Sequence, residues 1–94
     1  LVFNADASKA LDPDAKKTLT ELRQTLSSLP AFKSADIEGA IKEFSKQKDL
    51  KMGKVAMPFR AAITGTTNTP SVFHVAELFG RDETLARMDE VLSA

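Results

Sequence analysis

The chain has 94 residues, of which 43% are hydrophobic and 28% charged, and its formal net charge is zero. This length suits one domain with a single core. The absence of cysteine excludes a disulfide framework and a thiolate metal site. No apolar run approaches the ~18 residues that a membrane span needs, so no membrane partner is expected.

The first half of the sequence predicts helices with a leucine-rich inner face. Asp12-Pro13-Asp14 is typical of a helix start, with Asp12 as N-cap and Pro13 at the first helical position. The leucines that follow recur at steps of three and four, as on one face of a helix: Leu19, Leu22, Leu26 and Leu29. Pro30 is expected to end this helix.

A second long helix is expected after residue 33, capped by Ser34 or Asp36. Its apolar residues again follow helical spacing: Ile37, Ala40, Ile41 and Phe44. Gly39 lowers helix propensity by about 1 kcal/mol relative to alanine, which suggests that a neighbour packs closely there. Residues 46–49 are expected to form the hinge between a scaffold, 1–48, and a functional half, 49–94.

Two short helices that begin with proline are predicted in the functional half. Pro58 is expected at the first position of a helix that ends at Thr64-Gly65, where glycine suits a left-handed C-cap. Thr69 is expected to cap the next helix, with Pro70 at its first position. That helix should stop at Gly80.

This arrangement predicts a small recognition site. If the two helices form a hairpin, Arg60 and the intervening loop 66–68 should approach the backbone N–H groups near Thr69 and Ser71. A helix start supplies donors and partial positive charge, and arginine supplies a planar donor fork. We expect these groups to enclose a volume about the size of one or two nucleobases.

The last predicted helix runs over 83–93, with Asp82 as its cap and with inner residues Leu85, Met88, Val91 and Leu92. No segment alternates with period two over more than four residues. The sequence therefore predicts an all-α fold, a compact cage of five to six short helices.

The second half contains an ordered set of motifs: Gly53-Lys54-Val55, Pro58-Phe59-Arg60, Thr64-Gly65, Thr69-Pro70, Leu78-Phe79-Gly80 and Leu85-Ala86-Arg87. In these motifs, roughly the last 45 residues resemble the C-terminal anticodon-binding domain of bacterial-type glutamyl-tRNA synthetase. Three positions depart from the family pattern. Met57 replaces a frequent glutamine, Ser71 a frequent glycine and His74 a frequent acidic residue.

The resemblance implies that the chain recognises the anticodon loop of tRNA(Glu). In the family, the residues that correspond to Arg60, Thr69, Pro70 and Val72 contact anticodon bases. The resemblance also implies a longer, cytoplasmic glutamate-tRNA ligase with an upstream catalytic domain, where ATP and Mg²⁺ would bind; no cofactor is expected in these 94 residues. The chain begins Leu1-Val2-Phe3 without methionine, as expected of such a fragment. Nothing in the sequence suggests self-association, so a monomer is expected.

The charge distribution bears on this implication, because nucleic-acid affinity depends largely on phosphate neutralisation by lysine and arginine. Residues 42–60 carry six basic and two acidic side chains, whereas both flanking segments are acidic overall. Lys51 and Lys54 lead directly into the predicted site and are expected to steer the RNA backbone. A solvated surface face is the alternative interpretation of this basic run.

Two other functions stay open at this stage. The domain could be an all-helical protein-interaction module in which Phe59, Val72 and Phe73 bind a partner helix without RNA. A helix-turn-helix DNA binder is less suited, because its recognition helix over 70–79 would be apolar and carry Glu77. No catalytic residues are expected: His74 is the only histidine, and it has no second histidine or cysteine to form a metal site.

Overall fold

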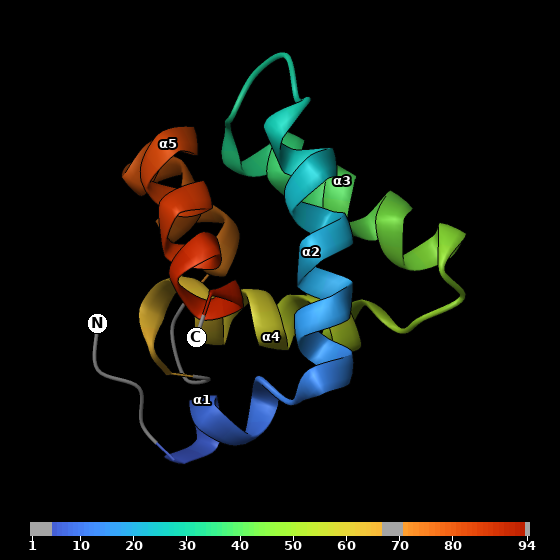
Figure 1. Ribbon diagram of the computed structural model, residues 1–94. Helices are drawn as coiled ribbons and strands as arrows, with labels where there is room; N and C mark the ends of the chain where they lie inside the picture. The colour runs from blue at the N-terminus through green and yellow to red at the C-terminus, as the bar shows by residue number, and fades with distance from the viewer. Residues whose placement is uncertain (1–4, 67–70, 94) are drawn as a thin grey trace.

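The computed structural model describes residues 5–66 and 71–93, and every regular element within them is an α-helix. The helices are α1 (Ala5–Ala10), α2 (Pro13–Ser27), α3 (Ser34–Gln47), α4 (Met52–Thr64) and α5 (Val72–Leu92). Figure 1 shows α5 on one side of the molecule and α2 and α3 on the other, with α4 crossing between them and α1. The all-α prediction is confirmed.

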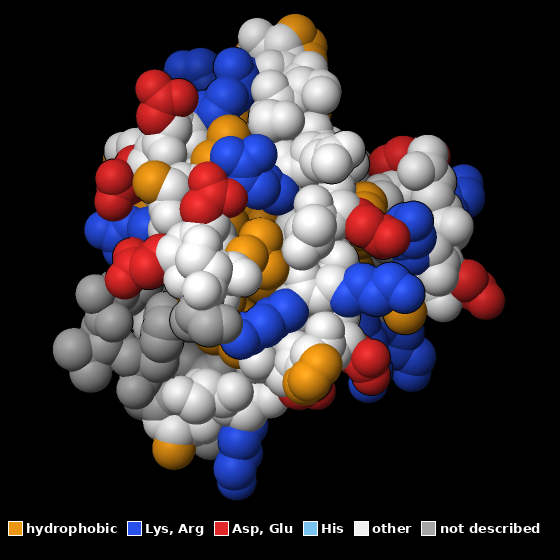
Figure 2. Space-filling view, in the orientation of Figure 1, with side chains coloured by type: hydrophobic (Ala, Val, Ile, Leu, Met, Phe, Trp, Pro, Cys, Tyr) orange, Lys and Arg blue, Asp and Glu red, His pale blue; other side chains and the backbone are white. Residues whose placement is uncertain are grey.

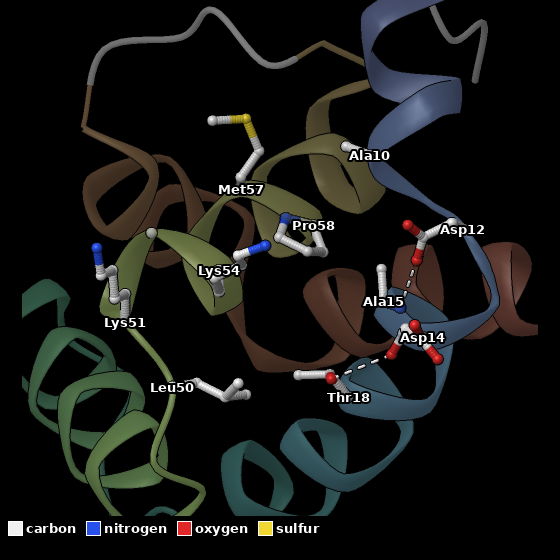
Figure 3. Close-up of a pocket in the computed structure, with 11 residues that line it drawn as sticks. Ala10, Asp12, Asp14, Ala15, Thr18, Leu50, Lys51, Lys54, Met57 and Pro58 are labelled. Atoms are coloured by element: carbon white, nitrogen blue, oxygen red, sulfur yellow. Dashed lines mark hydrogen bonds between the residues drawn. The ribbon is translucent and has the colours of Figure 1, made fainter.

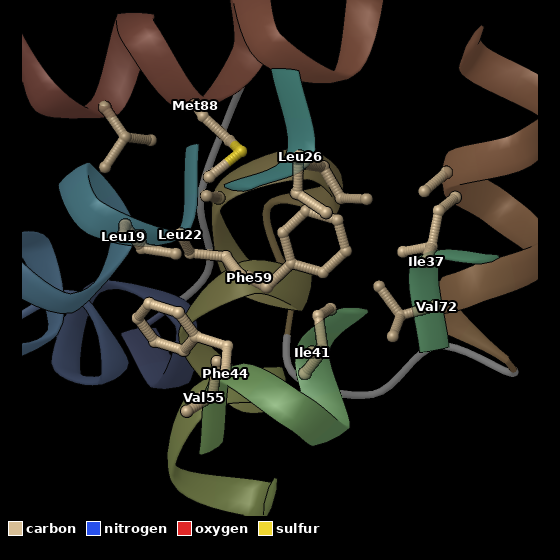
Figure 4. Close-up of a cluster of buried hydrophobic side chains, with 14 residues drawn as sticks. Leu19, Leu22, Leu26, Ile37, Ile41, Phe44, Val55, Phe59, Val72 and Met88 are labelled. Atoms are coloured by element: carbon tan, nitrogen blue, oxygen red, sulfur yellow. The ribbon is translucent and has the colours of Figure 1, made fainter. Parts of the chain in front are cut away.

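Helix α4 is the central element, since it packs against each of the other four helices. Its inner residues Val55, Phe59, Ala62 and Ile63 are fully buried. Figure 4 shows the ring of Phe59 among Leu22 and Leu26 of α2 and Ile41 of α3. Burying a phenylalanine side chain contributes roughly 1.5–3 kcal/mol relative to leaving it exposed. This contact holds α4 in place and thereby fixes its opposite, outer face.

The predicted start and inner face of α2 are confirmed. The side chain of Asp12 accepts a hydrogen bond from the backbone N–H of Ala15 at 2.8 Å, and Pro13 is the first helical residue. Leu19, Leu22 and Leu26 are fully buried. A carboxylate near the helix N-terminus also interacts favourably with the helix dipole.

The start of α3 is tied to α5. The N-cap residue is Lys33, not Ser34 or Asp36 as the sequence suggested. Asp36 instead accepts a hydrogen bond from the Lys33 N–H at 3.2 Å, and the Ser34 N–H donates to Glu77 of α5 at 2.6 Å. A carboxylate from another helix thus satisfies a donor at this helix start, which sequence-local capping rules could not anticipate.

The prediction that Pro58 begins a helix is wrong. Helix α4 begins at Met52, and Pro58 lies inside it with its side chain buried. A proline within a helix cannot donate to the carbonyl four residues earlier, here Lys54. The buried face of α4 continues on both sides of Pro58, and this packing outweighs the local preference of proline for a helix start.

The predicted stop at Gly80 is confirmed as a break within α5. Gly80 has φ 84° and ψ 166°, which is not helical, although helix is assigned on both sides of it. The hydroxyl of Thr84 is buried and donates to the carbonyl of Ala76 at 3.3 Å, across the break. Helix α5 is therefore two shorter helices, which accounts for the expected five to six helices.

Two glycines should respond in opposite ways to replacement by alanine. Gly39 is helical and exposed, and an added Cβ would meet no atom within 4 Å, so the expectation of a close neighbour there is wrong. Gly39→Ala should therefore stabilise the chain by about 0.5–1 kcal/mol. Gly80→Ala should destabilise it by about 1–3 kcal/mol, because only glycine readily adopts its backbone angles. Urea unfolding followed by circular dichroism measures both changes, and stabilisation by Gly80→Ala would contradict the described break.

The contact between α3 and α5 should depend on pH. The hydrogen bond from the Ser34 backbone lowers the pKa of the Glu77 carboxyl below its usual value of about 4.3. Stability from a lowered carboxylate pKa is fully present above the unfolded-state pKa and is lost as pH falls through the folded-state pKa. Glu77→Gln should thus flatten the fall in Tm below about pH 4.3. The exposed Glu38→Gln variant of α3 serves as the control, and equal pH profiles for both variants would contradict this role.

Candidate nucleic-acid interface

The outer face of α4 presents a continuous stripe of residues to the surface. Gly53, Met57, Arg60 and Thr64 follow one another at steps of four, three and four, so they lie on one side of the helix. Gly53 and Met57 are exposed, and Arg60 and Thr64 are partly exposed. We call these four residues the α4 outer stripe. It spans roughly 16 Å along the helix and ends beside the connection between α4 and α5, residues 65–71, which we call the bend.

The bend begins with a tightly specified turn. Gly65 adopts φ 76° and ψ 7°, and its N–H donates to the carbonyl of Ala61 at 2.9 Å, as predicted for a left-handed C-cap. The hydroxyl of Thr64 lies 2.6 Å from the Arg60 carbonyl oxygen and 2.9 Å from that of Thr66, and it accepts a hydrogen bond from the Thr66 N–H. The backbone of Arg60 is thus linked directly to the first residues of the bend.

The other end of the bend differs from the sequence prediction. Helix α5 begins at Val72, and its N-cap is Ser71, whose hydroxyl accepts from the His74 N–H at 3.4 Å. Ser71 and Val72 thus have the roles that the sequence predicted for Thr69 and Pro70. Both of these predicted site residues lie outside the described residues. The hydroxyl of Ser71 supplies the capping oxygen.

Arg60 is partly buried, and no ion-pair partner for its charge lies among the described residues, 5–66 and 71–93. Its Nε is shielded from solvent and has no hydrogen-bond partner there. Leaving a buried donor unpaired costs about 1–3 kcal/mol. Arg81, which donates to the Leu29 carbonyl, has an unpaired Nε of the same kind, so this atom does not by itself indicate a ligand. The absence of an ion pair among the described residues is what leaves the charge of Arg60 available to a ligand.

Lys51 and Lys54 line a pocket beside the stripe. The pocket has a volume of about 740 Å³ and lies between the start of α2, the end of α1 and the first half of α4. Figure 3 shows Lys51, Lys54 and Met57 on the α4 side and Asp12 and Asp14 on the α2 side. Asp12 and Asp14 would repel an anion inside the pocket. The α4 rim, which carries the two lysines, is therefore the part of the pocket suited to phosphate.

The position of these lysines is unfavourable for α4 itself. Lys51 is the N-cap, Lys54 lies in the first turn, and this turn carries no acidic residue. Cations near a helix N-terminus oppose the helix dipole. Neither lysine forms an ion pair within the part of the chain that the structure describes. Their charge is therefore available to an anionic partner.

The positive charge is local. Figure 2 shows Lys and Arg side chains interspersed with Asp and Glu over the visible face, without a large area of one sign. This agrees with the net charge of zero. A polyanion would thus find its favourable contacts in a few places and not over a whole surface.

Val72 lies in a different environment from the one expected of a base-contacting residue. It is 1% exposed and packs in the core with Ile37 and Ile41 of α3, as Figure 4 shows. In this conformation it offers no surface to a ligand. The protein-interaction alternative meets the same difficulty, because it needs Phe59 and Val72 at the surface and both are buried.

The described part of the chain holds no cluster of metal-binding side chains. No three His, Cys, Asp or Glu side chains come together there as a metal site would need. His74 is exposed, as expected for a lone histidine. Among the described helices, none has the length and apolar character needed to cross a lipid bilayer.

Sequence reasoning missed two features of the site. Thr64 was assigned only as the end of a helix, but its hydroxyl joins Arg60 to the bend. Leu50 and Met57 are exposed by 39% and 43% and form apolar parts of the pocket. The helical spacing of Met57 and Arg60 could have indicated the stripe, had the helix been predicted to begin before Pro58.

Comparisons with known proteins identify the family of the chain. The profile of a family described as "Anticodon binding domain" matches residues 2–92. The chain is 49% identical over 93 residues to Glutamate–tRNA ligase 2 of Zymomonas mobilis, which covers 99% of this chain and 19% of that protein. It is 43% identical over 94 residues to Glutamate–tRNA ligase 2 of Rhodospirillum centenum, covering 100% of this chain and 20% of that protein.

A solved structure shares the arrangement of helices. The crystal structure of a glutamate tRNA ligase from Elizabethkingia meningosepticum, in complex with its amino acid, superposes with a TM-score of 0.91 at 34% identity. The superposition covers 99% of this chain and 18% of that one. The chain thus spans about a fifth of the length of its curated relatives. With the family profile matching nearly every residue, the chain belongs to the anticodon-binding domain family.

Proposed function

We propose that this chain recognises the anticodon loop of tRNA(Glu), as the anticodon-binding domain of a glutamate-tRNA ligase. The whole ligase attaches glutamate to tRNA using ATP and Mg²⁺, which bind in an upstream catalytic domain. It acts in the cytoplasm as a monomer. In this proposal residues 1–48 form the scaffold and residues 49–94 carry the recognition surface.

One observation carries the proposal: the α4 outer stripe places an arginine that has no ion-pair partner among the described residues one turn before the end of α4. Arg60 has no charged partner in the described ranges, and its backbone is bonded through Thr64 to the turn at Gly65. Its planar fork can donate two hydrogen bonds to a base edge or a phosphate. Single-stranded RNA loops present unstacked bases to such donors.

The remaining predicted residues take different parts in this interface. Lys51 and Lys54 steer the RNA backbone from the rim of the pocket. Thr69 and Pro70 contact the bases beside Arg60. Val72 contributes from the core by anchoring the first turn of α5, since its side chain is buried.

Arg60 provides the direct test. Arg60→Ala in the whole ligase should raise KM for tRNA by the cost of a lost base contact, about 1–3 kcal/mol or roughly 5- to 150-fold. KM for ATP and glutamate should not change. Arg60→Lys keeps the charge but loses the fork, so it should restore only part of the affinity. Steady-state charging assays measure these constants, with the exposed Lys17→Ala variant as control. Unchanged tRNA charging by Arg60→Ala would refute the proposal.

The two lysines should act through salt-dependent phosphate contacts. Each lost contact to a single strand lowers the slope of log K against log salt by about 0.7, so Lys51→Ala with Lys54→Ala should lower it by about 1.4. Binding of an anticodon stem-loop at several salt concentrations measures this slope. The matched double variant Lys16→Ala with Lys17→Ala removes the same charge from α2. An equal change in slope for both pairs would mean that only net charge matters.

A further inference from the structure

Arg87 connects three groups that are distant in the sequence. Its Nη1 donates a hydrogen bond to the carbonyl oxygen of Ile63 at 2.9 Å, and its Nε donates to Glu83 at 2.9 Å. Its guanidinium carbon lies 4.2 Å from the centre of the Phe79 ring. The side chain is 27% exposed, so these contacts are partly shielded from water.

Each contact holds a different segment near the bend. Ile63 is the next-to-last residue of α4, and its carbonyl is one of the four that a helix end leaves without a helical donor. Phe79 precedes the break at Gly80, and Glu83 follows it. One guanidinium therefore joins the end of α4 to both halves of α5, and so fixes the two ends of the bend relative to each other.

The geometry requires arginine and not only positive charge. A guanidinium can lie over an aromatic ring while its edges donate to two acceptors. The ammonium group of lysine has no such plane. The cation also interacts favourably with the C-terminal end of the α4 dipole. A lysine at this position would keep that attraction but could not hold all three partners at once.

We propose that Arg87 is a positioning residue for anticodon recognition. It sets the spacing between Arg60 and the start of α5 without touching the RNA itself. This inference rests on the proposed function, because it assigns Arg87 a part in the same interface. It is distinct from a general stabilising role, for which Arg23 offers a comparison.

Arg23 is a matched control within the same fold. It forms a two-pronged ion pair with Asp89, joining α2 to α5, and its Nη2–Oδ2 distance is 2.9 Å. It has no contact with the end of α4 or with the bend among its described bonds. The Arg23→Lys variant therefore weakens an interhelical contact without removing the contacts of Arg87 with the end of α4.

The test compares Arg87→Lys with Arg23→Lys in the whole ligase. Arg87→Lys should raise KM for tRNA roughly 3- to 30-fold, as expected of a residue that acts through another. The kcat and KM values for ATP and glutamate should not change. Both variants should lower Tm, and by similar amounts, because each weakens a contact between helices. Arg23→Lys should change KM for tRNA by less than about twofold. If KM for tRNA changes equally in both variants, Arg87 is only structural and the inference is wrong.

Two further measurements keep the test decisive. If Arg87→Lys does not fold, Phe79→Leu is the second variant, because it removes the ring under the guanidinium but keeps a large apolar side chain. Phe79→Leu should also raise KM for tRNA. An unchanged KM for tRNA would overturn the inference. Arg60→Ala separates the two proposals. If it raises KM for tRNA while Arg87→Lys does not, only the positioning role fails. If Arg60→Ala has no effect, the proposed function fails and the inference fails with it.

Discussion

The burial of the inner face of α4 is the constraint on which the rest of the structure depends. Phe59 and its helical neighbours pack against α2, α3 and α5 at once, so the helix cannot rotate without losing core contacts. A close-packed interior resists such movement because even small voids are costly. The outer stripe is thereby held at a fixed orientation. Recognition of a ligand by Arg60 would then need little ordering of the α4 backbone on binding.

Hydrogen bonds at the end of α4 explain why the Arg60 side chain can be left for a ligand. The end of α4 is already satisfied by Gly65, Thr64 and the guanidinium of Arg87. Because of these internal bonds, the Arg60 side chain is not needed to close the helix. Arginines 23, 81 and 87, by contrast, each bond to another part of the fold. The division separates arginines that build the scaffold from the one whose charge has no internal partner among the described residues.

The zero net charge of the domain limits the affinity for RNA that the α4 outer stripe and its two neighbouring lysines can provide alone. Long-range attraction to RNA would be weak, and two lysines on one rim of a pocket with an acidic opposite wall act only at short range. Such a surface contributes selectivity more than overall affinity. This fits a domain that spans about a fifth of its relatives' length, since contacts elsewhere on a large RNA would add to the local ones.

The sequence by itself determined the helical class, the start of α2, the left-handed turn at Gly65 and the break at Gly80, because each depends on the chemistry of a few adjacent residues. Only the tertiary structure decided that α4 continues through Pro58, that the Glu77 carboxylate accepts the hydrogen bond from the Ser34 N–H at the start of α3, and that Val72 is buried. These outcomes depend on side chains brought together from distant helices. The packing free energy, summed over many contacts, outweighs a local conformational preference of about 1–3 kcal/mol. A short sequence pattern cannot predict that total, because the contacts come from other parts of the chain.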